Sequence, residues 1–313
     1  MRIVFMGTPD FSVPTLEALI ASEHDVVAVV TQPDKKSGRG QKLTAPPVKR
    51  CAEAHNIPVL QPEKMKDPEF IEALRNFEAD IQVVVAFRML PEMVWDMPPK
   101  GTFNVHTSLL PEYRGAAPIN WAVMNGETES GLTTFLLDHQ IDTGKILFQE
   151  KVSISPTMTA GELHDELMNL SGPLALKTLE AIESGDYKAI PQDLSIDYKH
   201  APKIFKEDML VPLKQPLQVA YNHIRGLSPY PGAHIEVLQE GETIAVKILS
   251  CHIEPNAQMG KTYSLGVYGK KLGLQHPDGM LWIETLKWPG KRLLKTSEFL
   301  NGFKFSEFLD VKA

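Results

Sequence analysis

The sequence predicts an α/β protein: an open, Rossmann-like, mostly parallel sheet, followed by a small OB-like β-barrel. The length of 313 residues favours two domains over one. In the first two thirds of the chain, short apolar runs alternate with helical patterns, which is typical of a parallel sheet covered by helices. In the last third, strand-like runs follow one another between glycine turns, which favours a barrel.

The elements of the first part follow from its periodicity. Short apolar runs predict strands at residues 2–6, 26–31, 59–60, 81–87, 102–106 and 131–137. Apolar side chains at helical spacing predict helices at residues 13–22, 47–55, 68–78 and 160–183. The last helix ends at Ser184-Gly185-Asp186, which is a helix stop signal. We therefore expect one α/β domain over residues 1–189.

The second part begins after a polar segment without periodicity, residues 190–205, which contains Pro191 and Pro202 and is predicted to be a linker. Residues 206–313 form the second predicted domain. It starts with a short helix at residues 219–226. Strand-like segments then cover residues 233–238, 243–251, 263–268, 271–276 and 280–286. Five short strands after one helix predict a small barrel.

Composition excludes several classes of protein. Apolar residues make up 43% and charged residues 23% of the chain, which is typical of folded globular proteins. No apolar run approaches the ~20 residues of a membrane span, and the start of the chain lacks the pattern of a secretory signal, so we expect a cytoplasmic protein without a membrane partner. Cys51 and Cys251 show no metal-binding spacing, so we expect neither a disulfide framework nor a metal site.

The charge is unevenly distributed. The chain has a net charge of -7, which argues against a uniformly basic nucleic-acid coat. Residues 1–202 hold 18 Lys and Arg against 28 Asp and Glu, whereas residues 203–313 hold 14 against 11. This asymmetry indicates a catalytic part and a C-terminal part with a different task.

The first candidate site is the end of the strand at residues 102–106. Asn104 and His106 are two positions apart and therefore face the same side of the strand. An amide donor beside a protonatable imidazole suits an oxyanion, because the amide can donate to the negative oxygen while the imidazole supplies charge or a proton. From the residues alone, a strand-end His is more often a hydrogen-bonded structural residue, and that alternative stays open.

A second polar segment, residues 138–144, follows the strand at residues 131–137 and carries Asp138 and Asp142. Asp142 is a candidate partner for His106 in an acid-base pair, and its alternative role is that of a turn residue before Thr143-Gly144. The sequence has no Gly-x-Gly-x-x-Gly fingerprint, no phosphate loop and no Gly-x-Ser-x-Gly elbow, so a nucleotide enzyme or a serine hydrolase is poorly supported.

Several motifs resemble those of one known family. They are Gly7-Thr8-Pro9-Asp10-Phe11, Thr31-Gln32-Pro33-Asp34, Gly38-Arg39-Gly40, Asn104-Val105-His106, Ser108-Leu109-Leu110-Pro111, Tyr113-Arg114-Gly115-Ala116-Ala117-Pro118-Ile119, Ile141-Asp142-Thr143-Gly144, Ala201-Pro202-Lys203-Ile204, Pro229-Tyr230-Pro231-Gly232-Ala233 and Phe299-Leu300-Asn301-Gly302. Over nearly its full length the chain resembles the methionyl-tRNA formyltransferases, a family of the folate-dependent formyltransferase superfamily. Arg88 and Thr107 depart from it, since smaller residues are usual at both positions.

The resemblance implies an activity and a set of site residues. It implies formyl transfer from 10-formyltetrahydrofolate, as co-substrate, to the α-amino group of methionyl initiator tRNA, for translation initiation, without a metal. Asn104, His106 and Asp142 match the catalytic trio. The residues that match the folate pocket are Ser108, Leu109, Leu110, Pro111, Phe87, Arg88, Met89, Leu90 and Asp138. The resemblance also makes residues 1–189 the formyltransferase catalytic domain and residues 206–313 the tRNA-binding barrel.

A basic segment is the candidate contact for tRNA. Residues 35–50 carry six basic side chains and no acidic one, and glycines flank Arg39. Such a loop suits tRNA phosphates, although a charge run is more often only a solvated surface. Within the resemblance, the segment matches the tRNA-contacting loop through Lys35, Lys36, Arg39 and Lys42. A second basic cluster, residues 287–295, is either a phosphate contact or a barrel turn.

Two rival functions stay open. One is an N-formyltransferase of the same superfamily that acts on an amino-sugar nucleotide; the basic loop and the barrel favour tRNA over it. The other is a noncatalytic RNA-binding protein, in which Asn104, His106 and Asp142 would be free to change. All three residues are present.

Overall fold

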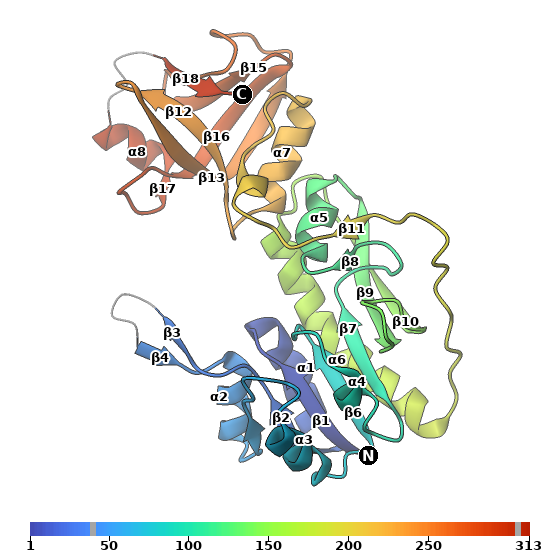
Figure 1. Ribbon diagram of the computed structural model, residues 1–313. Coiled ribbons are helices and arrows are strands. Elements are labelled where there is room, and N and C mark those ends of the chain that lie inside the picture. Colours follow the sequence, from blue (N-terminus) through green and yellow to red (C-terminus); the bar gives the residue numbers. More distant parts are fainter. Residues whose placement is uncertain (38–41, 304–307) are drawn as a thin grey trace. The chain divides into compact units, whose positions relative to one another are not determined.

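The computed structural model describes residues 1–37, 42–303 and 308–313, without the side chains of Ser37 and Lys42 (Figure 1). The chain forms two compact units. The first contains Met1–Pro118, Glu129–Ser153 and His164–Ala201, and the second contains Ile119–Thr128, Ile154–Leu163 and Pro202–Ala313. Most of the segment predicted to be a linker, residues 190–201, therefore lies within the first unit.

A seven-stranded sheet forms the centre of the first unit, in the order β10-β9-β7-β6-β1-β2-β5. The five neighbouring strands β7, β6, β1, β2 and β5 are parallel to one another. Strand β9 is antiparallel to β7, and β10 is antiparallel to β9. Their bounds are β1 Arg2–Gly7, β2 Asp25–Val30, β5 Val59–Leu60, β6 Ile81–Val85, β7 Thr102–His106, β9 Glu129–Leu136 and β10 Ile146–Ser153. All five residues of β6 are buried, as expected of a parallel strand covered on both faces.

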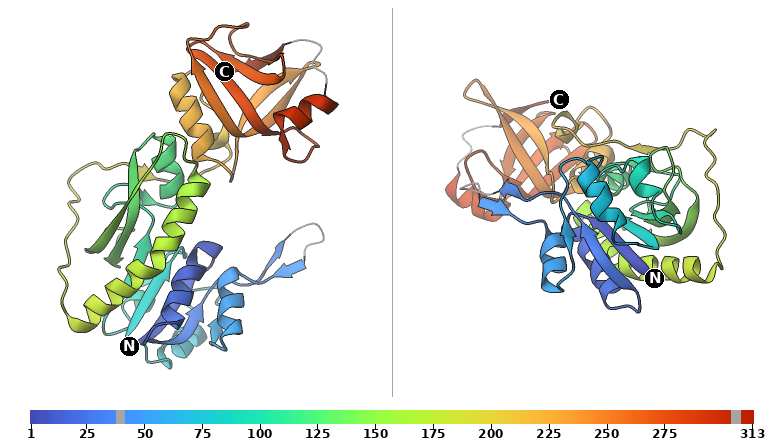
Figure 2. Two further views of the ribbon diagram at one scale, coloured as in Figure 1. Left: turned by 180° about the vertical axis from the view of Figure 1, so that it is seen from behind. Right: turned by 60° about the horizontal axis from the view of Figure 1, so that its bottom comes forward.

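Helices cover both faces of this sheet. On one face, α3 and α4 pack on apolar side chains of β1, β2 and β6. On the other face, α6 contacts α1 through a hydrogen bond of 2.7 Å between Thr15 and Ser171, and contacts β9 through Thr178 and Thr134 (Figure 2). The helices are α1 Val13–Ile20, α2 Pro47–Ala54, α3 Pro68–Arg75, α4 Glu92–Trp95 and α6 Ala160–Ser184, with a 3-10 turn, η1, at Asp10–Ser12.

Two short ladders complete the first unit. Within the basic segment, β3 Lys35–Ser37 pairs with β4 Lys42–Thr44 in an antiparallel hairpin. Near the site, β8 Arg114–Gly115 pairs in parallel with β11 His200–Ala201. No helix in the described ranges is both long enough and apolar enough to cross a membrane.

The second unit contains a closed six-stranded barrel. The strand order is β13-β12-β18-β14-β15-β16, and pairing between β13 and β16 closes it. The strands are β12 Ala233–Gln239, β13 Glu242–Pro255, β14 Ser264–Tyr268, β15 Lys271–His276, β16 Gly279–Lys287 and β18 Leu309–Lys312, with β17 Leu294–Lys295 added beside β16. Five of the six were predicted, and the sixth, β18, was not. The predicted fold class, an open α/β domain followed by an OB-like barrel, is confirmed.

The core of the second unit is assembled from distant parts of the chain. Its helices are α5 Pro118–Met124, α7 Leu217–Gly226 and α8 Thr296–Gly302, with a 3-10 turn, η2, at Glu207–Met209. Met124, from α5, is buried in the same apolar cluster as Ile224 of α7 and Leu265 of β14. Asn120 donates a hydrogen bond of 2.8 Å to the Gly226 carbonyl, which ties α5 to α7.

Candidate active site

The centre of the site is β7, where Asn104 and His106 lie on one face of the sheet. In the register of the sheet, Asn104 is opposite Val84 of β6 and Phe135 of β9. Val84 packs in the apolar cluster beneath α3 and α4, so both polar side chains belong to that face. His106 is buried, whereas Asn104 is half-buried, and its side-chain amide has no hydrogen-bond partner among the described residues. The amide is therefore available to a ligand.

Asp142 reaches His106 by an indirect route. Because β9 is antiparallel to β7, with Thr133 opposite His106 and Leu136 opposite Phe103, the chain leaves β9 at the end away from His106. It then folds back, and Oδ2 of Asp142 lies 3.9 Å from Nδ1 of His106. Asp142 therefore lies near His106, beyond hydrogen-bond distance, and it comes there by a fold of the chain and not from a neighbouring strand end.

Two backbone features allow this return. Asp142 has a φ of 55°, in the left-handed region that non-glycine residues rarely adopt. At Gly144 the chain passes so close to the Leu136 carbonyl that a Cβ would lie 1.6 Å from its oxygen. Only glycine can occupy that position without moving the loop.

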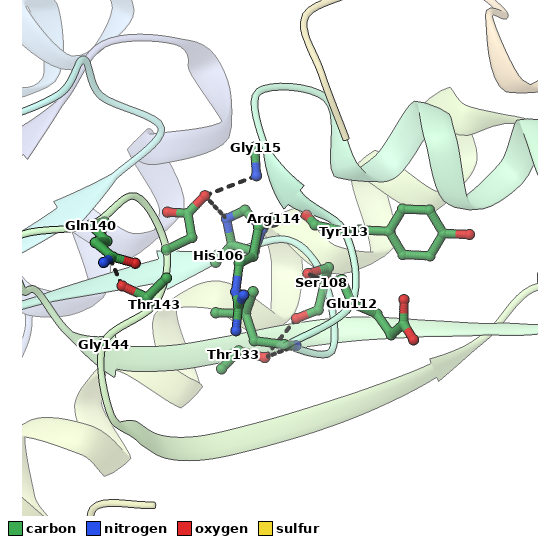
Figure 3. A network of polar contacts seen from close by, with 12 residues as sticks. His106, Ser108, Glu112, Tyr113, Arg114, Gly115, Thr133, Gln140, Thr143 and Gly144 are labelled. Carbon is green, nitrogen blue, oxygen red and sulfur yellow. Dashed lines mark hydrogen bonds and ion pairs between the residues drawn. The ribbon is translucent and has the colours of Figure 1, made fainter. Parts of the chain in front are cut away.

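The turn at Tyr113–Gly115 holds both members of the pair. The Nε2 atom of His106 lies 3.0 Å from the Tyr113 carbonyl oxygen, and the N–H of Gly115 donates to Oδ2 of Asp142 over 2.9 Å. Figure 3 shows the His106 ring beside this turn. A carbonyl only accepts hydrogen bonds, so Nε2 carries a hydrogen and Nδ1 is the nitrogen that gains or loses a proton.

The predicted folate-binding run at residues 108–111 is held rigidly from within. The Ser108 hydroxyl is fully buried and donates to the Glu112 carbonyl over 2.6 Å. Thr133 donates to the Ser108 carbonyl and accepts from the Leu110 N–H, over 2.6 and 3.0 Å. Ser108 and Leu110 are therefore structural residues of this turn, and the half-buried Leu109 and Pro111 are its accessible members.

The other two predicted folate segments lie next to each other. His139, in the loop of Asp138, approaches Glu92 of α4 at 3.7 Å and stacks edge-on against Trp95. Helix α4 directly follows residues 87–90, of which Met89 is the most exposed and Leu90 is buried. Asp138 itself organises its loop, because its Oδ1 accepts from the Gln140 N–H and the Thr143 hydroxyl.

The guanidinium group of Arg88 is bonded to the protein backbone. Its two terminal nitrogens donate to the backbone carbonyls of Pro62 and Glu63. Its Nε is buried and has no partner among the described residues, and burial lowers the pKa of the guanidinium. The Arg88 side chain thus ties the predicted folate segment to residues 62–63.

The predicted tRNA-binding residues are only partly described. Lys35 and Lys36 are exposed on β3, the side chain of Lys42 on β4 is not described, and Arg39 lies outside the described residues. Lys49, from the same basic segment, is tied to Asp34 at 2.9 Å. With Gln61, whose hydrogen bond is the larger influence, it lowers the pKa of Asp34. Lys49 is thus a structural residue.

Three supporting residues were not singled out as site residues by the sequence: Gly115, Thr133 and Gln192. Each acts through a contact distant in sequence, and no local pattern marks such contacts. Gly115 was visible only as part of a family motif. Within residues 1–37, 42–303 and 308–313, no three His, Cys, Asp or Glu side chains are grouped so as to hold a metal ion.

Comparison with known proteins places the chain in a family. The formyl transferase family model matches residues 1–178, and the model of the formyl transferase C-terminal domain matches residues 203–304. The methionyl-tRNA formyltransferase of Bacteroides fragilis is 50% identical over 318 aligned residues, which cover 100% of this chain and 98% of that protein. That of Moorella thermoacetica is 44% identical, with coverage of 97% and 96%.

Solved structures share the fold at lower identity. HypX from Aquifex aeolicus, in complex with tetrahydrofolic acid, is similar with a TM-score of 0.66 and 20% identity, covering 99% of this chain and 50% of that one. The sugar 3N-formyl transferase WlaRD, in the presence of dTDP and 5-N-formyl-THF, has a TM-score of 0.64 at 20% identity, with coverage of 93% and 99%. The identity over the full length decides between these relatives: the chain belongs to the methionyl-tRNA formyltransferase family.

Proposed function

We propose that this enzyme transfers the formyl group of 10-formyltetrahydrofolate to the α-amino group of methionyl initiator tRNA, with Asn104, His106 and Asp142 as its catalytic residues. The observation that carries the assignment of residues is the approach of Asp142 to Nδ1 of His106 at 3.9 Å, on the face that also presents Asn104. Since translation initiation is its task, we expect the enzyme to work in the cytoplasm.

Asn104 and His106 stabilise the charge that develops during transfer. When the amine attacks the formyl carbon, a nitrogen–carbon bond forms and the formyl oxygen becomes negative. The Asn104 amide, which bonds to no other side chain among the described residues, donates to that oxygen, and His106 adds positive charge nearby once its Nδ1 has taken the proton of the amine. Fixed donors in a buried site can lower such a barrier by about 3 kcal/mol.

His106 also moves the proton. The attacking amine must lose one proton, and the departing folate nitrogen must gain one when its bond to the formyl carbon breaks. Nδ1 of His106 is suited to both steps, because Tyr113 keeps the hydrogen on Nε2 and Asp142 faces Nδ1. A separation of 3.9 Å is longer than a hydrogen bond, and such contacts often shorten when substrate binds.

The folate ring would bind between residues 87–90 and the loop at 138–142, which lie next to each other. Met89 and Ile141 are 76% and 63% exposed, so each of the two segments presents an apolar side chain to a ligand. Leu109 and Pro111 add half-buried apolar surface from a turn that is braced internally. A flat ring with polar edges suits such a set of mainly apolar side chains.

Two basic regions suit the tRNA. The hairpin of β3 and β4 presents Lys35 and Lys36 to solvent, and we include Arg39 and Lys42 as tRNA contacts on the sequence alone. In the barrel, Lys247 and Lys287 lie directly opposite each other on β13 and β16. The Lys247 ammonium donates to the Pro231 carbonyl over 2.7 Å, so Lys287 is the exposed member of the pair that suits a phosphate backbone.

A parallel formylation assay tests this function. The purified enzyme receives 10-formyltetrahydrofolate with methionyl initiator tRNA, methionyl elongator tRNA or a dTDP-linked amino sugar. We expect rapid formylation of the initiator tRNA alone. Formylation of the sugar alone would show that the acceptor is an amino sugar, while the proposed formyl transfer would stand. The absence of transfer to any acceptor would refute the proposed function.

A further inference from the structure

A segment that looks like a plain linker in the sequence runs along the proposed active site. We call residues 190–201 the strap. Ile190 exchanges two backbone hydrogen bonds of 2.8 Å with Ile146, at the start of β10. At the other end of the strap, the Lys199 carbonyl accepts from the N–H of Tyr113 over 2.6 Å, and β11 pairs with β8. The strap therefore contacts both loops that hold the catalytic pair.

Between these anchors, the Gln192 side chain joins the two loops. Its Nε2 donates to the carbonyl oxygens of Asp142 and Gly144, at 3.0 and 2.7 Å. Its Oε1 accepts from Nε and Nη2 of Arg114, at 3.1 and 2.6 Å. Both amide hydrogens and both oxygen lone pairs are thus used. The orientation of the amide is unambiguous, since the reverse would oppose oxygen to carbonyls and NH₂ to a guanidinium.

The contacts form a closed circuit around Asp142. Its carboxylate accepts from the N–H of Gly115, and its carbonyl accepts from Gln192. Gln192 is held by Arg114, the residue just before Gly115. Asp142 has a left-handed backbone, which is strained for a residue other than glycine and persists only where surrounding contacts hold it. Gln192 supplies two of those contacts.

We propose that Gln192 is a positioning residue for formyl transfer: it holds the loop at 142–144 so that the Asp142 carboxylate stays against Nδ1 of His106. This inference rests on the proposed function, because Asp142 and His106 carry the chemistry there. The hydrogen-bonding groups of the Gln192 side chain are all used within the protein. Its effect on the rate therefore passes through Asp142.

The test compares Gln192→Ala, Gln192→Glu and Asp142→Asn, with Ser195→Ala as the matched control. Gln192→Glu keeps the size of the side chain and its bond to Arg114 but loses both donors to the loop. Ser195 lies in the strap, and its hydroxyl donates only to Asp193. We expect both Gln192 variants to lower kcat by about 10- to 100-fold, since a misplaced catalytic group costs up to that much. Ser195→Ala should keep the wild-type kcat.

A double-mutant cycle separates positioning from general support. In the Asp142→Asn background, measured in single turnovers, Gln192→Ala should lower the rate by less than about 3-fold, because the group that it positions is already gone. An equal loss in both backgrounds would show a merely structural role and overturn the inference. So would a wild-type kcat in Gln192→Glu, because Arg114 would then be the only partner that matters.

The experiment distinguishes a failure of the positioning role of Gln192 from a failure of the proposed function. Wild-type enzyme that fails to formylate methionyl-tRNA refutes the function itself. Active wild-type enzyme with fully active Gln192 variants refutes only the positioning role. Thermal unfolding of each variant identifies any that fail to fold, and Gln192→Glu, which retains the Arg114 contact, keeps the test decisive if the alanine variant is unstable.

Discussion

The Nε2 atom of His106 lies 3.0 Å from the carbonyl oxygen of Tyr113, a residue whose own backbone is left-handed, with a φ of 60°. The contact fixes the tautomer of the imidazole and directs Nδ1 toward Asp142. A single turn thus sets which nitrogen of His106 would take part in the proposed proton transfer, and the same turn holds the Asp142 carboxylate through Gly115.

His106→Ala and Asp142→Asn should each lower kcat by about 100-fold or more, the scale of a general acid-base contribution. His106 is the last residue of β7 and Asp142 lies in a loop, so neither substitution interrupts the sheet, and both variants should remain folded. Steady-state formylation of methionyl-tRNA gives kcat, and circular dichroism reports the fold. A folded His106→Ala enzyme with near-normal kcat would remove the imidazole from the mechanism.

Gly144→Ala should displace the Asp142 loop, because its Cβ would lie 1.6 Å from the Leu136 carbonyl oxygen. Overpacking of this kind costs about 1–3 kcal/mol, and we expect kcat to fall by about 10-fold or more as Asp142 moves. Gly302→Ala is the matched control, because no atom of the described residues lies within 4 Å of its added Cβ. Equal activity of the two alanine variants would mean that the loop tolerates the shift.

Acid should weaken the second unit through His223. The pKa of this side chain is lowered to about 4, mainly by burial and to a smaller extent by His234, with Asp208 opposing part of the shift. The unfolded chain, with a pKa near 6.5, then binds the proton more readily than the folded one. The free energy of unfolding should therefore fall as the pH drops from about 6.5 to 4, by on the order of 3 kcal/mol in total.

Urea unfolding at pH 7.5 and 4.5 checks this effect. In a Trp95→Phe background the remaining tryptophans, Trp121, Trp282 and Trp288, all report on the second unit. His223→Gln cannot titrate, so it should lose less stability between the two pH values than the enzyme with His223. The same loss in both proteins would assign the acid sensitivity to other groups.

Lys35 and Lys36 should contribute to tRNA binding and not to folate binding. Replacing both with alanine should raise KM for methionyl-tRNA. It should also reduce the slope of log KM against the logarithm of salt concentration by about 1–2, since binding of each lysine to phosphate releases about one counterion. Arg39→Ala should also raise KM, and Arg39→Lys should restore it only in part, because lysine lacks the planar fork. Kinetics against salt concentration measure these effects.

Lys151→Ala is the control for that experiment. Lys151 lies on β10, at the edge of the sheet opposite to β2 and β5, and pairs with Glu129 at 2.8 Å. Its loss should leave KM for tRNA and its salt dependence unchanged. A similar effect of Lys151→Ala and the hairpin variants would reduce the hairpin to one part of a general surface charge.

Elements with strong local patterns could be predicted from the sequence. The apolar run at residues 81–85 forms β6, and the residues with helical spacing from residue 160 onward form α6. The family resemblance is confirmed by relatives of 42–50% identity. The strand β10 was missed because half of its residues are polar and face solvent at the sheet edge, and β18 because it is only four residues long.

The site could be predicted only in part. The i, i+2 spacing of Asn104 and His106 places them on one face, which is a local rule. The approach of Asp142 depends on the antiparallel direction of β9 and on a left-handed backbone, neither of which is visible locally. The role assigned to Gln192 depends on a contact 50 positions away along the chain. The sequence around Gln192 predicts only a linker.

The order of synthesis has a consequence for folding, because the second unit takes α5 from the middle of the chain. Trp121 and Met124 pack with the barrel, yet the ribosome makes them about a hundred residues before the first barrel strand, β12. At typical elongation rates, on the order of 10 seconds pass between the synthesis of these apolar side chains and that of the strands they pack against. We expect chaperones to bind the nascent chain in this interval, and α5 to be the segment that they protect.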